Sequence, residues 1–189
     1  MAVRVDPPVQ TRKVTYAEYA AMPDDGHRYQ VIEGELIMSP APNKAHQHFL
    51  RNLFRILDSY ARTNKIGEVY FAPFDVVLSG ENVVQPDTFF VSKERLKIIT
   101  DANVQGAPDL VVEVLSPGTA QLDKAGKRDV YARFGVREYW LVSPEAGTIE
   151  VLALREGAYA RLGLFGAGDA VKSEVLSGLS FQTDSVFEE

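Results

Sequence analysis

The chain has 189 residues, of which 46% are hydrophobic and 24% are charged, proportions typical of one compact globular domain and unlike those of disordered, fibrous or membrane chains. It contains no cysteine, which excludes disulfide-stapled scaffolds, thiolate zinc sites, iron–sulfur clusters and cysteine nucleophiles. The formal net charge of −6 argues against a general nucleic-acid coat, but it permits a local basic surface.

The first residues carry no hydrophobic periodicity. Asp6-Pro7-Pro8 favours extended backbone, so we expect residues 1–13 to form an arm outside one domain of residues 14–189. No stretch approaches the ~18 apolar residues of a membrane-spanning helix, and no apolar segment typical of an export signal occurs. We therefore expect a cytoplasmic protein without a membrane partner.

Three signals define the elements that follow the arm. The Thr-x-x-Glu spacing of Thr15 and Glu18 is a capping box, which predicts a short helix from Thr15. Alternating apolar residues over 28–38 predict a β-hairpin, with Glu33-Gly34 as its turn. The proline-rich residues 39–42 end this hairpin.

The clearest helix is predicted over residues 44–65. On a helical wheel its polar face gathers five basic residues around a single acid: Lys44, His48, Arg51, Arg55, Asp58, Arg62 and Lys65. His46 falls instead on the opposite, apolar face. Arg51, Arg55 and Arg62 could bind the phosphate backbone of DNA, although a solvated surface helix would show the same pattern.

The rest of the chain alternates strands with helices. Strands are predicted over 68–79 and 83–91, joined by the turn Gly80-Glu81-Asn82, and over 109–115, which is apolar on both faces apart from its acids. The remaining predicted elements are helices over 92–100 and 121–134 and strands over 138–142, 148–154, 158–164 and 171–175. No internal repeat and no linker is evident.

Two acids lie within strands that otherwise read as core. Burying a carboxylate is costly unless a cation or several hydrogen-bond donors contact it. We therefore expect Asp87 and Glu113 to have such partners. Two neighbouring strands that aim carboxylates at one point can hold a hard divalent cation such as Mg²⁺. The alternative is an acid that caps a loop or pairs with an arginine. Asp109, ~13 Å from Glu113 along the strand, reads as a residue at the start of its strand.

A lysine lies on the buried face of the helix that follows Glu113. On the wheel of residues 121–134, Lys127 falls on the stripe of Val130, Tyr131 and Phe134. A snorkelling stem that pairs with Asp123 would explain this position. An inward ammonium beside two acids could also orient an attacking water and stabilise charge on a phosphate.

Two acids on neighbouring strands, the first in a Pro-Asp dipeptide and with a lysine close behind the second, resemble the PD-(D/E)XK restriction-endonuclease-like superfamily. A longer string is similar to the Uma-type family of candidate bacterial endonucleases, formerly a domain of unknown function. Its motifs are Arg28-Tyr29, Glu33-Gly34-Glu35-Leu36, Ser39-Pro40, His46, Pro86-Asp87, Val112-Glu113-Val114-Leu115-Ser116-Pro117, Asp123, Lys127, Tyr131 and Gly135-Val136-Arg137-Glu138-Tyr139-Trp140-Leu141-Val142.

The resemblance implies roles for individual residues. Asp87 and Glu113 match metal ligands, and Lys127 matches a catalytic lysine that the family carries on the next helix, since Leu115 occupies the superfamily's usual lysine position. A further acid is expected near the first hairpin. Glu35 matches it or is a solvated hairpin acid, while Gln30 stands where relatives tend to have Glu.

Together these observations predict an α/β, restriction-endonuclease-like fold with a mixed, mostly antiparallel sheet flanked by helices. We expect Mg²⁺- or Mn²⁺-dependent hydrolysis of phosphodiester bonds in DNA, with Asp87, Glu113 and the Val114 carbonyl as ligands. Lys127 would orient water, and Glu35 or His46 would complete the site. Cutting both strands would favour a homodimer. The alternatives are a nuclease-like domain that binds DNA or a protein without cutting, and a small-molecule-binding domain whose acids are structural.

Overall fold

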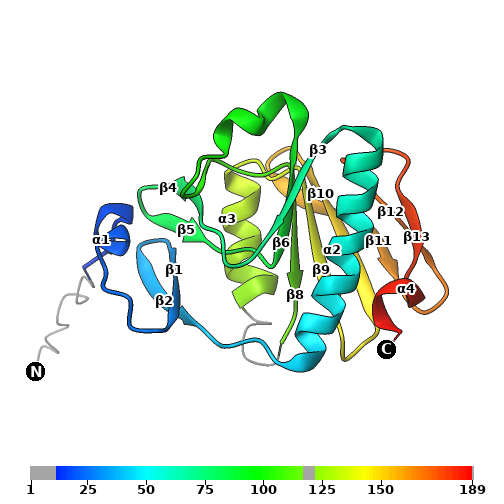
Figure 1. Ribbon diagram of the computed structural model, residues 1–189, viewed down its shortest axis with the longest axis horizontal. Coiled ribbons are helices and arrows are strands. Elements are labelled where there is room, and N and C mark those ends of the chain that lie inside the picture. Colours follow the sequence, from blue (N-terminus) through cyan, green and yellow to red (C-terminus); the bar gives the residue numbers. More distant parts are fainter. Residues whose placement is uncertain (1–11, 117–121, 189) are drawn as a thin grey trace, which may run out of the picture.

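The structure, a computed structural model, describes residues 12–116 and 122–188 (Figure 1). The predicted arm therefore lies outside the described residues except for its last two. Pro117, the last residue of the motif that contains Glu113, and the first residue of the helix predicted over 121–134 also lie outside them. In chain order the elements are α1 (Tyr16–Ala20), β1 (Arg28–Ile32), β2 (Glu35–Ser39), α2 (Lys44–Asn64), β3 (Gly67–Phe71), β4 (Val76–Ser79), β5 (Asn82–Val84), β6 (Thr88–Ser92), η1 (Lys93–Ile98), β7 (Val104–Gln105), β8 (Leu110–Val114), η2 (Leu122–Lys127), α3 (Arg128–Arg133), β9 (Glu138–Ser143), β10 (Thr148–Arg155), β11 (Ala158–Phe165), β12 (Ala170–Lys172), β13 (Ser180–Gln182) and α4 (Asp184–Phe187).

The strands form two main sheets. One has six strands in the order β11-β10-β9-β8-β6-β3, and the other has five in the order β2-β1-β5-β4-β7, while β12 and β13 pair separately. Among the described strands, β8 and β9 run parallel, as do β4 and β7, and the other neighbours are antiparallel. The predicted α/β fold with mixed, mostly antiparallel pairing is confirmed.

Helices cover both faces of the six-stranded sheet (Figure 1). On one face, Leu50, Leu53 and Leu57 of α2 pack in a core that includes the alternate β8 residues Leu110, Val112 and Val114. On the other, Val130 and Tyr131 of α3 pack in a core that includes Val111. Side chains of a strand alternate between faces, so Glu113 belongs to the α3 side with Val111.

Both strands predicted on either side of the Gly80-Glu81-Asn82 turn are divided between the two sheets. Residues 68–79 become β3 and β4, and residues 83–91 become β5 and β6. The breaks fall at Pro73 and Pro86, because proline has no N–H to donate to a sheet. Asp87 consequently lies at the passage from one sheet to the other.

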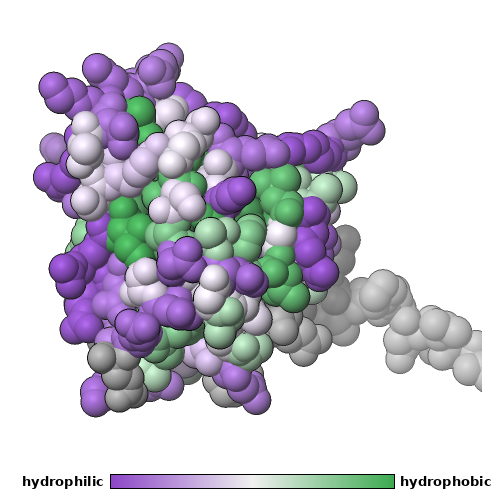
Figure 2. Space-filling view, turned by 90° about the vertical axis from the view of Figure 1, so that its right-hand side faces the viewer, coloured by the Kyte–Doolittle hydropathy of each residue, from purple (hydrophilic) through white to green (hydrophobic). Residues whose placement is uncertain are grey.

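Other sequence signals act as predicted. The Thr15–Glu18 capping box is formed, and α2 ends where Lys65 adopts the left-handed conformation at φ 54°. The sequence patterns missed β7, β13 and α4, which are short. None of the helices in the described ranges combines the length and apolar character needed to span a bilayer. Hydrophobic residues reach the surface near the middle of the face where α2, α4, β12 and β13 lie (Figure 2).

Two buried acids are satisfied by the fold itself. Glu138, at the start of β9, accepts hydrogen bonds from Trp140 Nε1 at 2.6 Å, Ser173 Oγ at 2.7 Å and the amides of Glu174 and Val175 at 2.8 and 3.0 Å. Asp109 precedes β8, where it accepts from the Ser92 amide at 2.8 Å and pairs with Arg95 at 3.0 Å. Asp109 therefore lies at the start of its strand, as predicted from the sequence.

Replacing Asp109 by alanine should lower the free energy of unfolding by about 2 kcal/mol at pH 7, because the Ser92 amide and the Arg95 guanidinium lose the buried carboxylate that pairs with them. Burial acts to raise the pKa of Asp109, but the Ser92 amide and Arg95 outweigh it and hold the pKa below its usual value. A carboxyl with a depressed folded-state pKa stabilises above its unfolded pKa, and the gain is lost as pH falls through the folded pKa. The difference between wild type and variant, measured by urea unfolding, should therefore shrink below about pH 4.

Asp101→Ala serves as the matched control for this prediction, since Asp101 is an exposed acid in the loop after η1. It should leave both the unfolding free energy and its pH dependence nearly unchanged. Equal effects of the two variants would show that Asp109 contributes nothing through its buried partners.

Candidate active site

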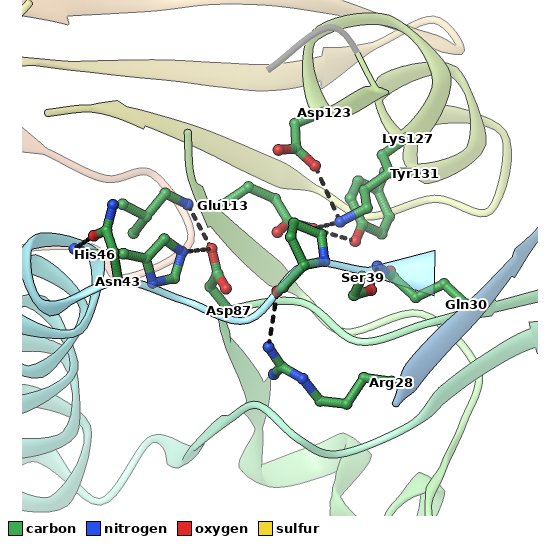
Figure 3. Close-up of polar contacts among 12 residues, drawn as sticks. Arg28, Gln30, Ser39, Asn43, His46, Asp87, Glu113, Asp123, Lys127 and Tyr131 are labelled. Carbon is green, nitrogen blue, oxygen red and sulfur yellow. Dashed lines mark hydrogen bonds and ion pairs between the residues drawn. The ribbon is translucent and has the colours of Figure 1, made fainter. Parts of the chain in front are cut away.

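A pocket of ≈ 270 Å³ lies where β6 and β8 come together near the start of α2. Its wall includes Asp87, Glu113 and Val114 from the six-stranded sheet, Gln30 and Ser39 from the first hairpin, His46 from α2, and Asp123 and Lys127 from η2. Figure 3 shows these side chains converging from separate elements. Sequence segments that are distant along the chain therefore meet at one hollow.

The strand register brings the two predicted acids side by side. Thr88 of β6 pairs with Val112 of β8, so one step further along the same antiparallel ladder Asp87 comes opposite Glu113. Asp87 Oδ2 accepts a hydrogen bond from the Val114 amide at 2.7 Å, which ties the aspartate to β8. The backbone thus fixes both carboxylates at the same end of the sheet.

Glu113 is held by two buried donors on the neighbouring helix. Its Oε1 accepts from Lys127 Nζ at 2.9 Å and from the Tyr131 hydroxyl at 2.8 Å. The side chains of Glu113 and Lys127 are only 3% and 4% exposed. Lys127 therefore points inward to the acid, as the helical wheel predicted, and its charged end does not snorkel to solvent.

Asp123 completes this group from one turn before Lys127. Lys127 Nζ lies 3.0 Å from Asp123 Oδ1, close enough for an ion pair, yet that buried oxygen has no well-aligned hydrogen bond among the described residues. The segment is a π-helix, a wide helical turn that occurs frequently at functional sites. Asp123, Lys127 and Tyr131 are spaced four residues apart, which places all three on the face toward Glu113.

The electrostatics of the pocket are dominated by an excess of carboxylates. Burial is the largest influence on the pKa of Glu113, which is raised to about 8. The Lys127 ammonium acts to lower this pKa, and the Asp123 and Asp87 carboxylates act to raise it further. Burial alone would lower the pKa of Lys127, but Glu113 and Asp123 outweigh it and raise the pKa above its usual value. Three acidic side chains thus face one ammonium that stays charged, and burial favours the neutral form of Glu113.

His46 approaches the pocket from the first turn of α2. Its Nε2 lies 3.0 Å from Asp87 Oδ2, and its Nδ1 is buried without a hydrogen-bond partner among the described residues. The Asn43 side chain caps the helix by accepting a hydrogen bond from the backbone amide of His46 at 2.9 Å. This contact fixes the backbone position from which the imidazole extends. The position of His46 on the apolar face of the wheel reflects its contact with Asp87.

Glu35 is not brought into the pocket. It is exposed at the start of β2, next to the Glu33-Gly34 turn, whereas Gln30 and Ser39 line the pocket from the other end of the same hairpin. The four residues from Glu35 to Ser39 span ~13 Å of extended strand, too far for the carboxylate to join the other acids. The expectation that Glu35 completes the site therefore has no support in the geometry.

The three arginines predicted to bind nucleic acid are all exposed along α2. Arg51 is closest along the helix to the pocket, while Arg62 lies three turns further on and pairs with Asp58 at 2.8 Å. They share one helix face, but Arg62 has a partner that offsets its charge.

Several pocket residues were not singled out as site residues in the sequence. Asp123, which lines the pocket, and Tyr131, which holds Glu113 from outside it, could have been found from their spacing of four residues on either side of Lys127, which places them on its face of a helix. Gln30 had no such signal, because its role depends on contacts across the sheets: its amide donates to Ser39 Oγ at 2.8 Å and its carbonyl accepts from the Gln85 amide at 3.0 Å.

The donor set fits a hard divalent cation. Among the described residues, no group of three or more His, Asp or Glu side chains is arranged as a metal cage. Mg²⁺ does not require one, because it usually keeps several waters and takes one or two carboxylates. Asp87 and Glu113 supply such a pair, and Asp123 adds a third acid beside the single ammonium of Lys127.

Comparisons with known proteins agree with this geometry. The model of the Uma2 family, described as "Putative restriction endonuclease", matches residues 16–184. A crystal structure of a protein from Anabaena variabilis, described as a putative nuclease belonging to DUF820, superposes with a TM-score of 0.78 at 19% sequence identity, covering 92% of this chain and 97% of that chain. No curated protein matches the sequence. The structural likeness confirms the restriction-endonuclease-like fold.

Proposed function

The chain belongs to the Uma2 family of restriction-endonuclease-like proteins, and from this membership we propose that it is a divalent-metal-dependent endonuclease that hydrolyses phosphodiester bonds in DNA. The observation that carries the proposal is the meeting of Asp87, Glu113 and Lys127 in one pocket whose carboxylates outnumber its ammonium groups. A surface acid cluster would be solvated, whereas Glu113 and Asp123 are buried against a single ammonium and Asp87 lies next to them.

The acids, the lysine and the histidine of the pocket each have a part in the proposed reaction. Asp87 and Glu113, with the Val114 carbonyl, would hold Mg²⁺ or Mn²⁺, which when bound supplies Lewis-acid stabilisation of a phosphate oxygen. Lys127, fixed between Glu113 and Asp123, would orient the attacking water and offset charge that builds on the phosphate. His46 would hold the Asp87 carboxylate in position through its 3.0 Å contact. We leave Glu35 out of this arrangement.

The basic face of α2 would position the substrate. Arg51, Arg55 and Arg62 are exposed on one side of the helix that begins at the pocket, so a phosphate backbone that passes the site can follow them. Such contacts set affinity and its salt dependence rather than sequence preference.

Incubation with supercoiled plasmid, single-stranded DNA and RNA tests the proposal. We expect cleavage of DNA in Mg²⁺ or Mn²⁺ and none in EDTA, with Asp87→Asn purified in parallel as the control for contaminating nuclease. Nicked rather than linear plasmid would indicate that one strand is cut at a time. DNA binding with no turnover on any substrate would support the nuclease-like domain that binds without cutting.

A further inference from the structure

A second hollow lies beside the candidate active site, along the first turns of α2. This aromatic groove has a volume of ≈ 470 Å³ and is lined by Lys44, Gln47, His48, Leu50, Arg51, Phe54 and Phe71. Gln47 and Leu50 line the active-site pocket as well, and Ala72, which follows Phe71 in the chain, also belongs to that pocket. The groove and the pocket are therefore adjacent, with Gln47 and Leu50 between them.

The groove presents an unusually open aromatic side chain. Phe71 ends β3 at the edge of the six-stranded sheet, and 53% of its surface is exposed. Its ring meets that of Phe54 at 4.8 Å between centroids and 73° between planes, an edge-on contact that fixes the ring without burying it. Among the described large hydrophobic side chains that are exposed, Phe71 combines a fixed aromatic ring with a place in the wall of a hollow, where a ligand can reach its face.

The rim of the groove is basic, in contrast to the chain as a whole. Its lining contains Lys44, His48 and Arg51 but no aspartate or glutamate, although the net charge of the protein is −6. Arg51 donates to His48 Nδ1 at 3.1 Å and to Asn52 Oδ1 at 3.4 Å, and neither of these acceptors is a carboxylate. The guanidinium therefore keeps its charge available for an anion.

An exposed aromatic ring flanked by basic side chains and adjacent to the candidate active site matches the chemistry of an unpaired nucleotide. Bases stack on aromatic rings in proteins that bind single strands, while basic side chains follow the backbone. A duplex keeps its bases inside the stack and would use only the cations. A second copy of this chain fits less well, because a symmetric contact would set each basic rim against its own copy.

We propose that the aromatic groove binds an unpaired base of single-stranded DNA next to the phosphate that enters the active site. The base stacks on Phe71, and Arg51 and Lys44 contact the flanking phosphates. This proposal rests on the endonuclease function proposed above and adds to it the class of substrate: single strands, or single-stranded segments at the ends and junctions of duplexes.

Fluorescence anisotropy in EDTA tests the groove without turnover. The probes are a short fluorescein-labelled DNA strand and the same strand annealed to its complement, at one salt concentration. Wild type should bind the single strand more tightly than the duplex. Phe71→Leu keeps an apolar side chain but removes the ring, and it should weaken single-strand binding about tenfold while changing duplex binding less than about twofold.

Two further variants make the test specific. Phe71→Tyr retains a ring and should bind the single strand like wild type. Leu164→Ala removes another large exposed side chain, 52% exposed on β11, and should change neither affinity. The proposal is overturned if Phe71→Leu binds the single strand like wild type, or if its affinities for single strand and duplex fall equally. It is also overturned if wild type binds the duplex more tightly than the single strand.

These outcomes separate the groove from the proposed reaction. Binding that depends on Phe71 in a protein that cleaves no substrate would remove the nuclease function and leave the groove as a single-strand binding surface. Metal-dependent cleavage that is unaffected by Phe71→Leu, with unchanged binding, would remove the groove and leave the nuclease function in place.

Discussion

Lys127→Met should reduce single-turnover cleavage by about a thousandfold or more, the scale expected when a preorganised charge beside the reacting phosphate is lost. Methionine keeps the apolar stem that packs between η2 and β8 but carries no ammonium to sit between Glu113 and Asp123. Affinity for Mn²⁺, measured by calorimetric titration, should be equal or higher, since a positive charge has been removed from beside the carboxylates.

The same variant also reports on a purely structural role for Lys127. Without a cation its buried acids are left unpaired, so the variant should melt at a lower temperature in EDTA and regain more stability from added Mn²⁺ than wild type does. Lys93→Met, a change at an exposed lysine at the start of η1, is the matched control and should alter none of these quantities. Retained cleavage per folded molecule in Lys127→Met would assign the lysine to packing alone.

Glu113→Gln should abolish cleavage to a similar degree while leaving the protein as stable as wild type or more stable by about 1 kcal/mol. Glutamine has the same shape and can still accept from Tyr131 and Lys127, but it removes one of three carboxylates that face a single ammonium. The measurements are single-turnover cleavage and urea unfolding, both in EDTA and in Mn²⁺. In Mn²⁺ the variant should gain less stability than wild type, because a ligand has been lost.

Glu150→Gln provides the comparison for this change, since Glu150 is a strand acid that pairs with exposed Arg161 on the surface. It should affect neither cleavage nor the response to Mn²⁺. If the free energy of unfolding of Glu113→Gln in EDTA is instead several kcal/mol lower than that of wild type, the carboxylate is a structural partner of Lys127. The excess of acids then does not destabilise the fold.

Local patterns predicted those parts of the molecule that depend on neighbouring residues. The helix over 44–65 and the Glu33-Gly34 hairpin follow from periodicity, capping and turn chemistry, and they appear as α2 and the β1–β2 pair. The inward direction of Lys127 also follows from helical periodicity. Once the apolar stripe of a helix is known, the residues that point toward the core are known as well. The family resemblance then added the expectation that this lysine and the two acids share a site.

Contacts between distant segments could not be predicted in the same way. An acid in an apolar strand drew attention to Asp87 and Glu113, yet Asp109 and Glu138 are at least as buried as Glu113. What distinguishes them is the number of donors that reach each carboxylate, and those donors come from segments far along the chain. Glu35 was predicted to join the site from its place in a family motif. That motif did not reveal at which end of the hairpin the pocket would form.

The four hydrogen bonds of Glu138 have a practical consequence for dissecting this chain. Three of them come from residues 173–175, which lie beyond every residue of the candidate active site and of the aromatic groove. A fragment that stopped before Ser173 would keep all of those residues, but it would leave the Glu138 carboxylate with only Trp140 to donate to it. Because β9 pairs with β8 from Leu110 to Val114, that defect would sit next to the strand that carries Glu113. Any shortened protein made to isolate the site must therefore extend past Val175.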